Sequence, residues 1–203
     1  MVRTFTKFNL PTEPEYFSLY KQINHEVWQS FERHEISAEE LRPLRFQRFL
    51  TAIKEERDAV EMSTFFLYEL SQSDFLIEGA RTLVDHLKSK GHRLALITNG
   101  LKEVQRPRIA KSEMGKHFDA IVVSDEIGVA KPHGGFFEYA FNEMGNPAKE
   151  EVVVVGDSLS SDIQGGNNFG VSTCWFNPDQ NNNLTGHTPK YVISSLKSLH
   201  EIV

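Results

Sequence analysis

Cysteine, long apolar runs and clusters of basic residues are all scarce in this chain of 203 residues. The single cysteine, Cys174, cannot form an internal disulfide and is typical of a reducing cytoplasm. No apolar run approaches the roughly 20 residues of a membrane-spanning helix, and residues 1–8 contain no signal-peptide core. The formal net charge is −6 without a long basic run, so we expect a cytoplasmic protein with no nucleic-acid or membrane partner.

The composition is that of an ordinary folded protein. Apolar residues make up 39% of the chain and charged residues 25%, which excludes a disordered polypeptide. A chain of this length buries roughly 70% of its unfolded surface, so it needs no disulfide or structural metal to hold a core. We expect one large domain or two small ones.

The first third of the chain has apolar residues at helical spacing. One predicted helix face comprises Tyr16, Leu19, Tyr20, Ile23 and Val27. Ser37 and Glu40 read as a capping box that opens a second helix through Leu50. Val60 and Phe66 belong to the apolar pattern of a third helix, which ends near residues 71–74. This part of the chain is therefore predicted to be a helical bundle.

After residue 76 the apolar pattern changes to short continuous runs, which are typical of strands buried on both faces of a parallel sheet. Strands are predicted at residues 94–97, 120–123, 152–155, 171–176 and 191–193. Helices are predicted at residues 79–90, 102–114, 135–144 and 159–169, with a last one ending at residue 202. The alternation predicts an α/β fold, a doubly wound parallel sheet with right-handed crossovers.

Polar residues follow three of the predicted strands. Thr98 and Asn99 follow the first strand, Lys131 comes after the second, and Asp157 and Asp162 follow the run of four valines. Ligands of parallel sheets bind outside the carboxyl ends of the strands, so these side chains are expected along one edge. A lysine and helix N-termini suit a phosphate, while carboxylates suit Mg²⁺.

These motifs resemble those of a known family. ITNG around Thr98, VAKP around Lys131 and the segment GDSLSSD resemble motifs II, III and IV of haloacid dehalogenase (HAD) superfamily hydrolases. The segment SDEIGVAKP and the pair Cys174–Trp175 most resemble the 5′-nucleotidases that act on pyrimidine and modified pyrimidine nucleotides. The resemblance covers nearly the whole chain. It implies a HAD-like Rossmannoid core at residues 76–203, with helices on both faces of the sheet, and a helical cap at residues 1–75.

The resemblance also implies a role for each site residue. Thr98 would bind the substrate phosphate with help from the Asn99 backbone, and Lys131 would stabilise its negative charge. Asp157 would ligate Mg²⁺, and Asp162 would orient the lysine or a metal-bound water. The implied substrate is a small phosphate monoester, a nucleoside monophosphate above all.

One motif of the family has no counterpart. Its motif I, an Asp-x-Asp after the first strand, supplies the nucleophile and the general acid/base, and no Asp-x-Asp occurs in the 203 residues. The cap is accordingly expected to be truncated at its N-terminus, with Met1 an internal start of a longer natural product. Loss of a nucleophile costs on the order of 10⁶ in rate in another covalent enzyme, so this chain alone is expected to be inactive or nearly so.

The missing strand also matters for the sheet. In the family it lies between the strand ending at Ile97 and the strand ending at Val155. Each buried unpaired backbone group costs about 1–3 kcal/mol, so an empty position is unfavourable. For the folded chain we expect either direct pairing of the two edges or a homodimer formed by strand exchange.

Each site residue also has an ordinary structural interpretation. Thr98 could cap a turn, Lys131 could be a solvated loop lysine, and Asp162 could be a first-turn helix acid. Asp125 and Glu126 are interpreted as loop acids, and the eight histidines show no metal-ligand spacing. His34 is expected on a helix face. The rival functions are a non-catalytic HAD-like protein that serves binding or assembly, and a haloacid dehalogenase.

Overall fold

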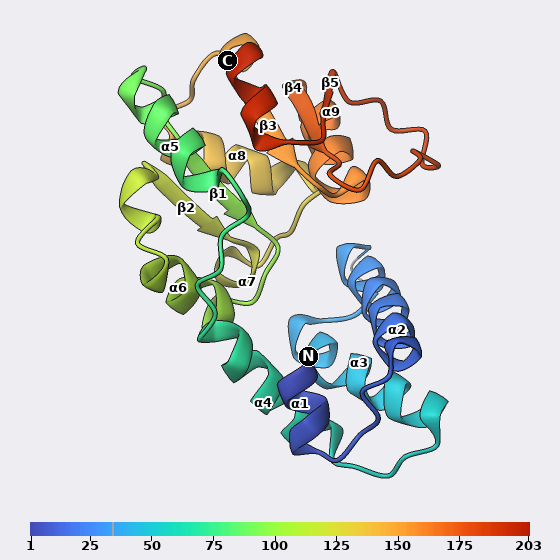
Figure 1. The fold of residues 1–203 in the computed structure, drawn as a ribbon. Helices are drawn as coiled ribbons and strands as arrows, with labels where there is room; N and C mark the ends of the chain where they lie inside the picture. The colour runs from blue at the N-terminus through green and yellow to red at the C-terminus, as the bar shows by residue number, and fades with distance from the viewer. Residues whose placement is uncertain (34) are drawn as a thin grey trace. The chain divides into compact units, whose positions relative to one another are not determined.

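Helices form the first part of the chain and alternate with strands in the remainder (Figure 1). The computed structural model describes residues 1–33 and 35–203, so His34, predicted on a helix face, lies outside the described residues. Met1–Ser73 together with Glu103–Arg108 form one compact unit, called here the helical unit. Asp74–Lys102 and Ile109–Val203 form the second, called the α/β unit. Among the described residues, no helix is both long enough and apolar enough to cross a membrane.

The helical unit forms as the spacing and capping residues predict. Its helices are α1 (Val2–Lys7), α2 (Pro14–Glu32), α3 (Ala38–Ile53) and α4 (Ala59–Ser71). The capping box is confirmed: the Ser37 hydroxyl accepts from the Glu40 N–H, and the Glu40 carboxylate accepts from the Ser37 N–H at 2.8 Å. Asp58 caps α4 by accepting from the N–H groups of Val60 and Glu61. Pro14 is the first residue of α2, so α2, α3 and α4 all begin at residues that favour a helix start.

Aromatic side chains fill the centre of the helical unit. Phe5, Phe46 and Phe49 are fully buried, and Phe5 stacks on Phe49 with 5.0 Å between ring centroids. Tyr20 of α2 contacts the rings of both Phe46 and Phe49. Val60, which the sequence placed in the apolar pattern of the third helix, is 58% exposed.

The exposure of Val60 follows from the phase of α4. Met62, Phe66 and Leu67 form the buried face of that helix. Val60 lies two positions before Met62, on the opposite side of the helix, and is therefore exposed.

The α/β unit contains the five predicted strands within one residue of their expected bounds. They are β1 (Ala95–Thr98), β2 (Ala120–Val123), β3 (Val153–Gly156), β4 (Ser172–Phe176) and β5 (Tyr191–Ile193). The helices are α5 (Ala80–Ser89), α6 (Lys102–Lys111), α7 (Ser124–Ile127), α8 (Gly134–Glu143) and α9 (Gln164–Phe169). Shorter turns are η1 (Gly115–His117), η2 (Lys149–Glu151), η3 (Leu159–Ile163) and η4 (Leu196–Glu201).

Three helical segments differ from the prediction. The segment 159–169 opens with π-helical turns, η3, before it continues as α9. The acids expected in a loop, Asp125 and Glu126, lie in α7, and the last helix is a 3₁₀ helix. Short irregular helices of this kind depend on local hydrogen bonds that apolar spacing does not report.

The strands form two parallel sheets (Figure 1). In one, Ala95 of β1 lies opposite Ala120 of β2. In the other, β3 pairs with β4 and β4 with β5, with Cys174 opposite both Val155 and Tyr191. Within the described chain, β1 and β3 belong to different sheets and are not paired, so the expectation of direct pairing was wrong.

Neighbouring side chains of α8 pack against the two sheets. Phe136 of α8 packs with Val122 of β2, whereas the next residue, Phe137, packs with Val154 of β3. Ile97 of β1 packs against both of these clusters, so α8 packs against both sheets.

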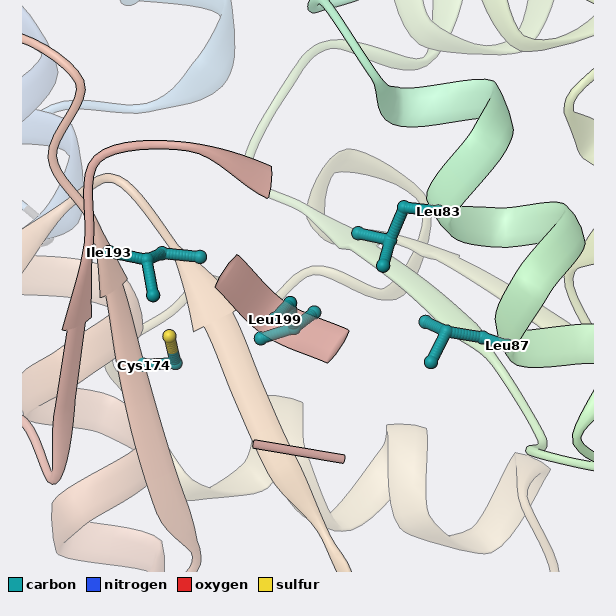
Figure 2. Close-up of a cluster of buried hydrophobic side chains, with 5 residues drawn as sticks. All are labelled: Leu83, Leu87, Cys174, Ile193 and Leu199. Carbon is teal, nitrogen blue, oxygen red and sulfur yellow. The ribbon is translucent and has the colours of Figure 1, made fainter. Parts of the chain in front are cut away.

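A second cluster covers the other face (Figure 2). Leu83 and Leu87 of α5 lie there with Cys174, Ile193 and Leu199 from the C-terminal part of the chain. Leu94, just before β1, and Val153, at the start of β3, also pack against this cluster. Burial raises the pKa of the Cys174 thiol to about 11, so the thiol stays protonated and unreactive at neutral pH.

Burial differs between the strands. β2 and β4 are largely buried, as expected for strands within a covered parallel sheet. All four residues of β1 are only half-buried, and Val155 of β3 is 36% exposed. The expectation of burial on both faces therefore holds for β2 and β4 but fails for β1 and at Val155 of β3.

Candidate functional site

The carboxyl end of β1 leads into a tight turn. Thr98 is the last residue of β1, and its hydroxyl accepts a hydrogen bond of 3.0 Å from the Gly100 N–H. The Asp125 carboxylate accepts from the N–H of Lys102, the first residue of α6. Thr98 therefore has a local structural task, and Asp125 accepts from a free N–H at the N-terminus of α6.

The Asn99 side chain holds the segment that carries Lys131. Its amide oxygen accepts from the Lys131 N–H at 2.8 Å, and its amide nitrogen donates to the Lys131 carbonyl at 2.9 Å. This reciprocal pair of hydrogen bonds joins the end of β1 to Lys131, which lies 32 positions further along the chain. The resemblance implied a role for the Asn99 backbone, and the structure adds a role for its side chain.

Lys131 and Asp162 form a buried ion pair. The Lys131 ammonium donates to the Asp162 carboxylate at 2.6 Å and to the Ile97 carbonyl at 3.1 Å. Both side chains are only 8% exposed. The second Asp162 oxygen accepts from the Ser158 N–H at 3.1 Å, so both carboxylate oxygens are engaged. The Lys131 head group is thus fixed between the end of β1 and the turn that follows β3.

Two glycines allow this close approach. A Cβ atom on Gly156 would lie 2.2 Å from the Asp162 carboxyl carbon, which no side chain tolerates. A Cβ atom on Gly165 would lie 2.5 Å from the Phe137 ring and 3.0 Å from the Pro132 backbone. Ser158 then caps η3 by accepting from the Ser161 N–H. The segment GDSLSSD can therefore fold back onto Lys131 because glycines stand at the contact points.

Asp157 is held through its backbone and is exposed. Its carbonyl accepts from the indole N–H of Trp175 at 3.0 Å. No group of three or more His, Cys, Asp or Glu that could hold a metal occurs among residues 1–33 and 35–203. Mg²⁺ is usually held by one or two carboxylates together with waters and phosphate oxygens. Asp157 is thus a single exposed carboxylate that could hold Mg²⁺ only together with waters or phosphate oxygens.

The structure links only some of the predicted site residues to one another by hydrogen bonds. Asn99, Lys131 and Asp162 are linked by direct hydrogen bonds. Thr98 and Asp157 stand at the ends of β1 and β3, and no hydrogen bond of either side chain to Lys131 is found among the described residues.

Ser124 is a neighbour that the sequence reasoning passed over. It directly follows β2, is 2% exposed, and its hydroxyl has no hydrogen-bond partner in the described part of the chain. Its position directly after a buried strand was the signal that could have singled it out, because strand ends of parallel sheets carry ligand-binding groups. At the end of β1, the Lys131 ammonium and the Thr98 hydroxyl are the donors that could face an anion.

A family model matches most of this chain. The family described as haloacid dehalogenase-like hydrolase matches residues 8–170. The chain belongs to this family. The HAD resemblance of the sequence motifs and the α/β fold class are thereby confirmed.

Several members of the HAD family are similar over most of this chain. Pyrimidine 5′-nucleotidase YjjG of Escherichia coli is 29% identical over 99% of this chain and 88% of its own length. Pyrimidine 5′-nucleotidase PynA of Streptococcus pneumoniae is 32% identical over 91% of this chain and 78% of its own. The solved structure of the HAD-hydrolase YfnB of Bacillus subtilis, bound to magnesium, has a TM-score of 0.91 at 31% identity, covering 98% of this chain and 86% of that one.

Proposed function

We propose that this protein is a Mg²⁺-dependent phosphohydrolase of the HAD family whose substrates are pyrimidine nucleoside monophosphates. The observation that carries the proposal is the buried Lys131–Asp162 pair, held by Asn99 beside the end of β1. A fixed ammonium at the carboxyl ends of parallel strands attracts a phosphate group. The names of YjjG and PynA support the nucleotide class.

In this proposal each residue has a defined task. Thr98 and Asn99 bind the phosphate, and the Lys131 ammonium compensates its charge. Asp162 positions Lys131, because one carboxylate oxygen accepts from the ammonium while the other is held by the Ser158 N–H. Asp157 would hold Mg²⁺, which when bound screens the negative charge of the phosphate oxygens.

The domain assignment is part of the same proposal. Residues 1–75 serve as the cap and residues 76–203 as the core that carries the phosphate site. The only cysteine is buried and its thiol stays protonated, which supports a cytoplasmic protein without disulfides.

The proposal also assigns a low activity to this chain alone. The HAD reaction begins with attack of an aspartate on phosphorus, and no Asp-x-Asp is found in the sequence. Residues that bind the phosphate remain, so we propose that the chain binds phosphate monoesters but turns them over extremely slowly. A homodimer formed by strand exchange would cover the open edges of β1 and β3, and sedimentation velocity decides whether a dimer forms.

The experiment compares this chain with an extended form that carries an added N-terminal strand ending in Asp-x-Asp. Phosphate release from uridine and thymidine monophosphate is measured with and without Mg²⁺. The extended form is expected to release phosphate only with Mg²⁺, and Lys131→Met in that form is expected to abolish the release. No release from either nucleotide would overturn the nucleotidase assignment.

The same two proteins distinguish the rival functions. Halide release from a 2-haloacid, without phosphate release, would identify a dehalogenase. The absence of both products, in an extended form that still binds orthophosphate, would identify a non-catalytic member of the family.

A further inference from the structure

A cavity of about 460 Å³ lies at the amino ends of β4 and β5. Ser172 is the first residue of β4, and Lys190 directly precedes β5. The rest of the lining comes from η2, from α9 and from the residues that follow α9. Thr98 and Asp157, by contrast, stand at the carboxyl ends of their strands and are not part of this lining. The cavity is therefore distinct from the proposed phosphate site, and its volume lies within the range of small-molecule sites.

A hydrogen-bond network fixes one part of the lining. The fully buried Thr173 hydroxyl donates to the Asn167 amide oxygen at 2.8 Å and accepts from the Lys190 N–H at 3.4 Å. The Asn167 amide nitrogen donates to the Thr188 carbonyl at 2.9 Å. These polar groups have partners within the chain, so they hold the start of β4, α9 and the segment before β5 together around the cavity.

Two lysines of the lining keep hydrogen-bond donors for a ligand. The Lys149 ammonium donates to the Phe169 carbonyl and lies 3.9 Å from the centroid of the Phe169 ring. The Lys190 ammonium donates to the Ser172 hydroxyl at 3.1 Å. Each ammonium has three donors, and within residues 1–33 and 35–203 neither of these two has a carboxylate partner. The contacts with Phe169 and Ser172 position both charges and leave donors of each unused.

The remaining polar groups also favour an anion. The Ser172 hydroxyl accepts from Lys190 and keeps its own proton to donate. The lining contains the Glu150 carboxylate, which is exposed and forms no ion pair with Lys149 or Lys190 in the described part of the chain. Two ammoniums and one carboxylate give the lining a net positive charge. The ligand that these donors select is negatively charged and has several acceptor oxygens.

We propose that this cavity binds a small phosphorylated molecule whose phosphate group is held by the Lys149 and Lys190 ammoniums. A phosphate monoester carries a charge of about −1.5 to −2 at neutral pH and three acceptor oxygens, which match two ammoniums and a hydroxyl. Lysine binds phosphate as a compact point charge. Val171 and Pro189, which also line the cavity, offer apolar contacts to the group that carries the phosphate. The proposal does not depend on the proposed phosphohydrolase activity.

The test is an NMR titration of the full 203-residue chain with ribose 5-phosphate, with orthophosphate and succinate as comparison ligands. The amides of Gly170, Ser172 and Lys190 report binding in the cavity. The amides of Thr98 and Gly100 report the proposed phosphate site in the same spectra. Because the two sets of amides are followed separately, failure of the cavity to bind is distinguishable from failure of the proposed function.

Ribose 5-phosphate is expected to shift the cavity amides saturably and to bind more tightly than orthophosphate, which lacks the attached group. Lys149→Met and Lys190→Met should each raise the dissociation constant by about tenfold, because each removes a charge-assisted hydrogen bond. Glu150→Gln should lower it by about twofold, because it removes a like charge beside the ligand. Lys197→Met is the control: it removes the same charge at an exposed lysine of η4 outside the lining, and should leave the dissociation constant unchanged.

Three results would overturn the proposal. The first is that ribose 5-phosphate does not shift the cavity amides. The second is that orthophosphate or succinate binds there as tightly as ribose 5-phosphate, which would show that the cavity does not select a phosphorylated molecule. The third is that Lys197→Met weakens binding as much as Lys149→Met, which would show that only the net charge of the protein matters.

Discussion

The helical unit and the α/β unit complete their cores to different extents. Phe5, Phe46 and Phe49 of the helical unit are fully buried. In the α/β unit every residue of β1 is half-buried and Val155 of β3 is 36% exposed. Helices satisfy their backbone locally and need only a packed face, whereas a strand needs neighbours on both sides. The comparison teaches that one unit is complete from local patterns and the other depends on pairing across its sheet.

Two tryptophans allow the comparison to be measured within the intact chain. Trp28 lies in α2 of the helical unit, and Trp175 lies in β4 of the α/β unit. Trp175→Phe leaves a fluorescence probe of the helical unit alone, and Trp28→Phe leaves one of the α/β unit. The predictions below use these two backgrounds in denaturant titrations.

The largest effect is expected in the aromatic core of the helical unit. Phe46→Ala removes a fully buried ring that contacts Tyr20 and Phe66, which should lower the free energy of unfolding by about 3–5 kcal/mol. Trp28 fluorescence reports the loss. Tyr68→Ala, at an aromatic side chain of α4 that is 59% exposed, is the matched control and should change little. A small effect of Phe46→Ala would show that the helical core is packed no more tightly than the half-buried strand β1.

The buried ion pair should give an effect of similar size in the α/β unit. Lys131→Met leaves the Asp162 carboxylate buried without its cation, which should cost about 3–5 kcal/mol by Trp175 fluorescence. The double variant Lys131→Met/Asp162→Leu removes both charges and is expected to recover most of the loss. An equal loss in the double variant would contradict a dominant role of the unpaired charge.

Gly156→Ala tests the close contact behind Asp162. The new methyl group would lie 2.2 Å from the Asp162 carboxyl carbon, so the turn must shift, at a cost of about 1–3 kcal/mol. Gly134→Ala is the matched control, because a Cβ atom there meets no atom within 4 Å. Equal stability of the two variants would show that Asp162 moves freely, and the ion pair would then not be fixed.

Removal of the Arg45 charge is expected to leave stability unchanged or to raise it, in contrast to the variants above. Its guanidinium is 3% exposed, two of its nitrogens have no hydrogen-bond partner in the described residues, and burial lowers the pKa of Arg45. Arg45→Met is therefore expected to leave the stability of the helical unit unchanged or raise it by up to about 2 kcal/mol. Arg48→Met, at an exposed position of α3, is the control. A loss of stability in Arg45→Met would contradict a net cost of this charge.

The smallest effect is a dependence on pH. Burial, followed by the charges of His200, Lys90 and His92, holds the pKa of His86 below its ordinary value. The unfolded chain then binds the proton more readily, so this stabilisation is present above about pH 6.5 and is lost as the pH falls through the lowered value. Trp175 titrations should show a smaller loss on acidification in His86→Asn than in the parent. If the stability of both proteins depended on pH in the same way, His86 would not contribute to that dependence.

The sequence predicted most of the fold and the direct links of the site. Short continuous apolar runs located β1 to β5, and Ser37 with Glu40 located the start of α3, because these signals are local. The motifs also pointed to Lys131 and Asp162, which the structure joins directly. The hydrogen bonds of the Asn99 side chain and the separation of β1 from β3 were not predicted, since they depend on contacts between distant segments. The π-helical η3 was not predicted because apolar spacing does not report local hydrogen bonds.

The central claim is that the end of β1, with Lys131, is a phosphate site, and an NMR titration with orthophosphate and Mg²⁺ tests it most directly. The account predicts saturable shifts of the Thr98, Asn99 and Gly100 amides that are absent in Lys131→Met and kept in Lys190→Met. Shifts confined to the cavity of about 460 Å³ that Lys149 and Lys190 line beside β4 would contradict it.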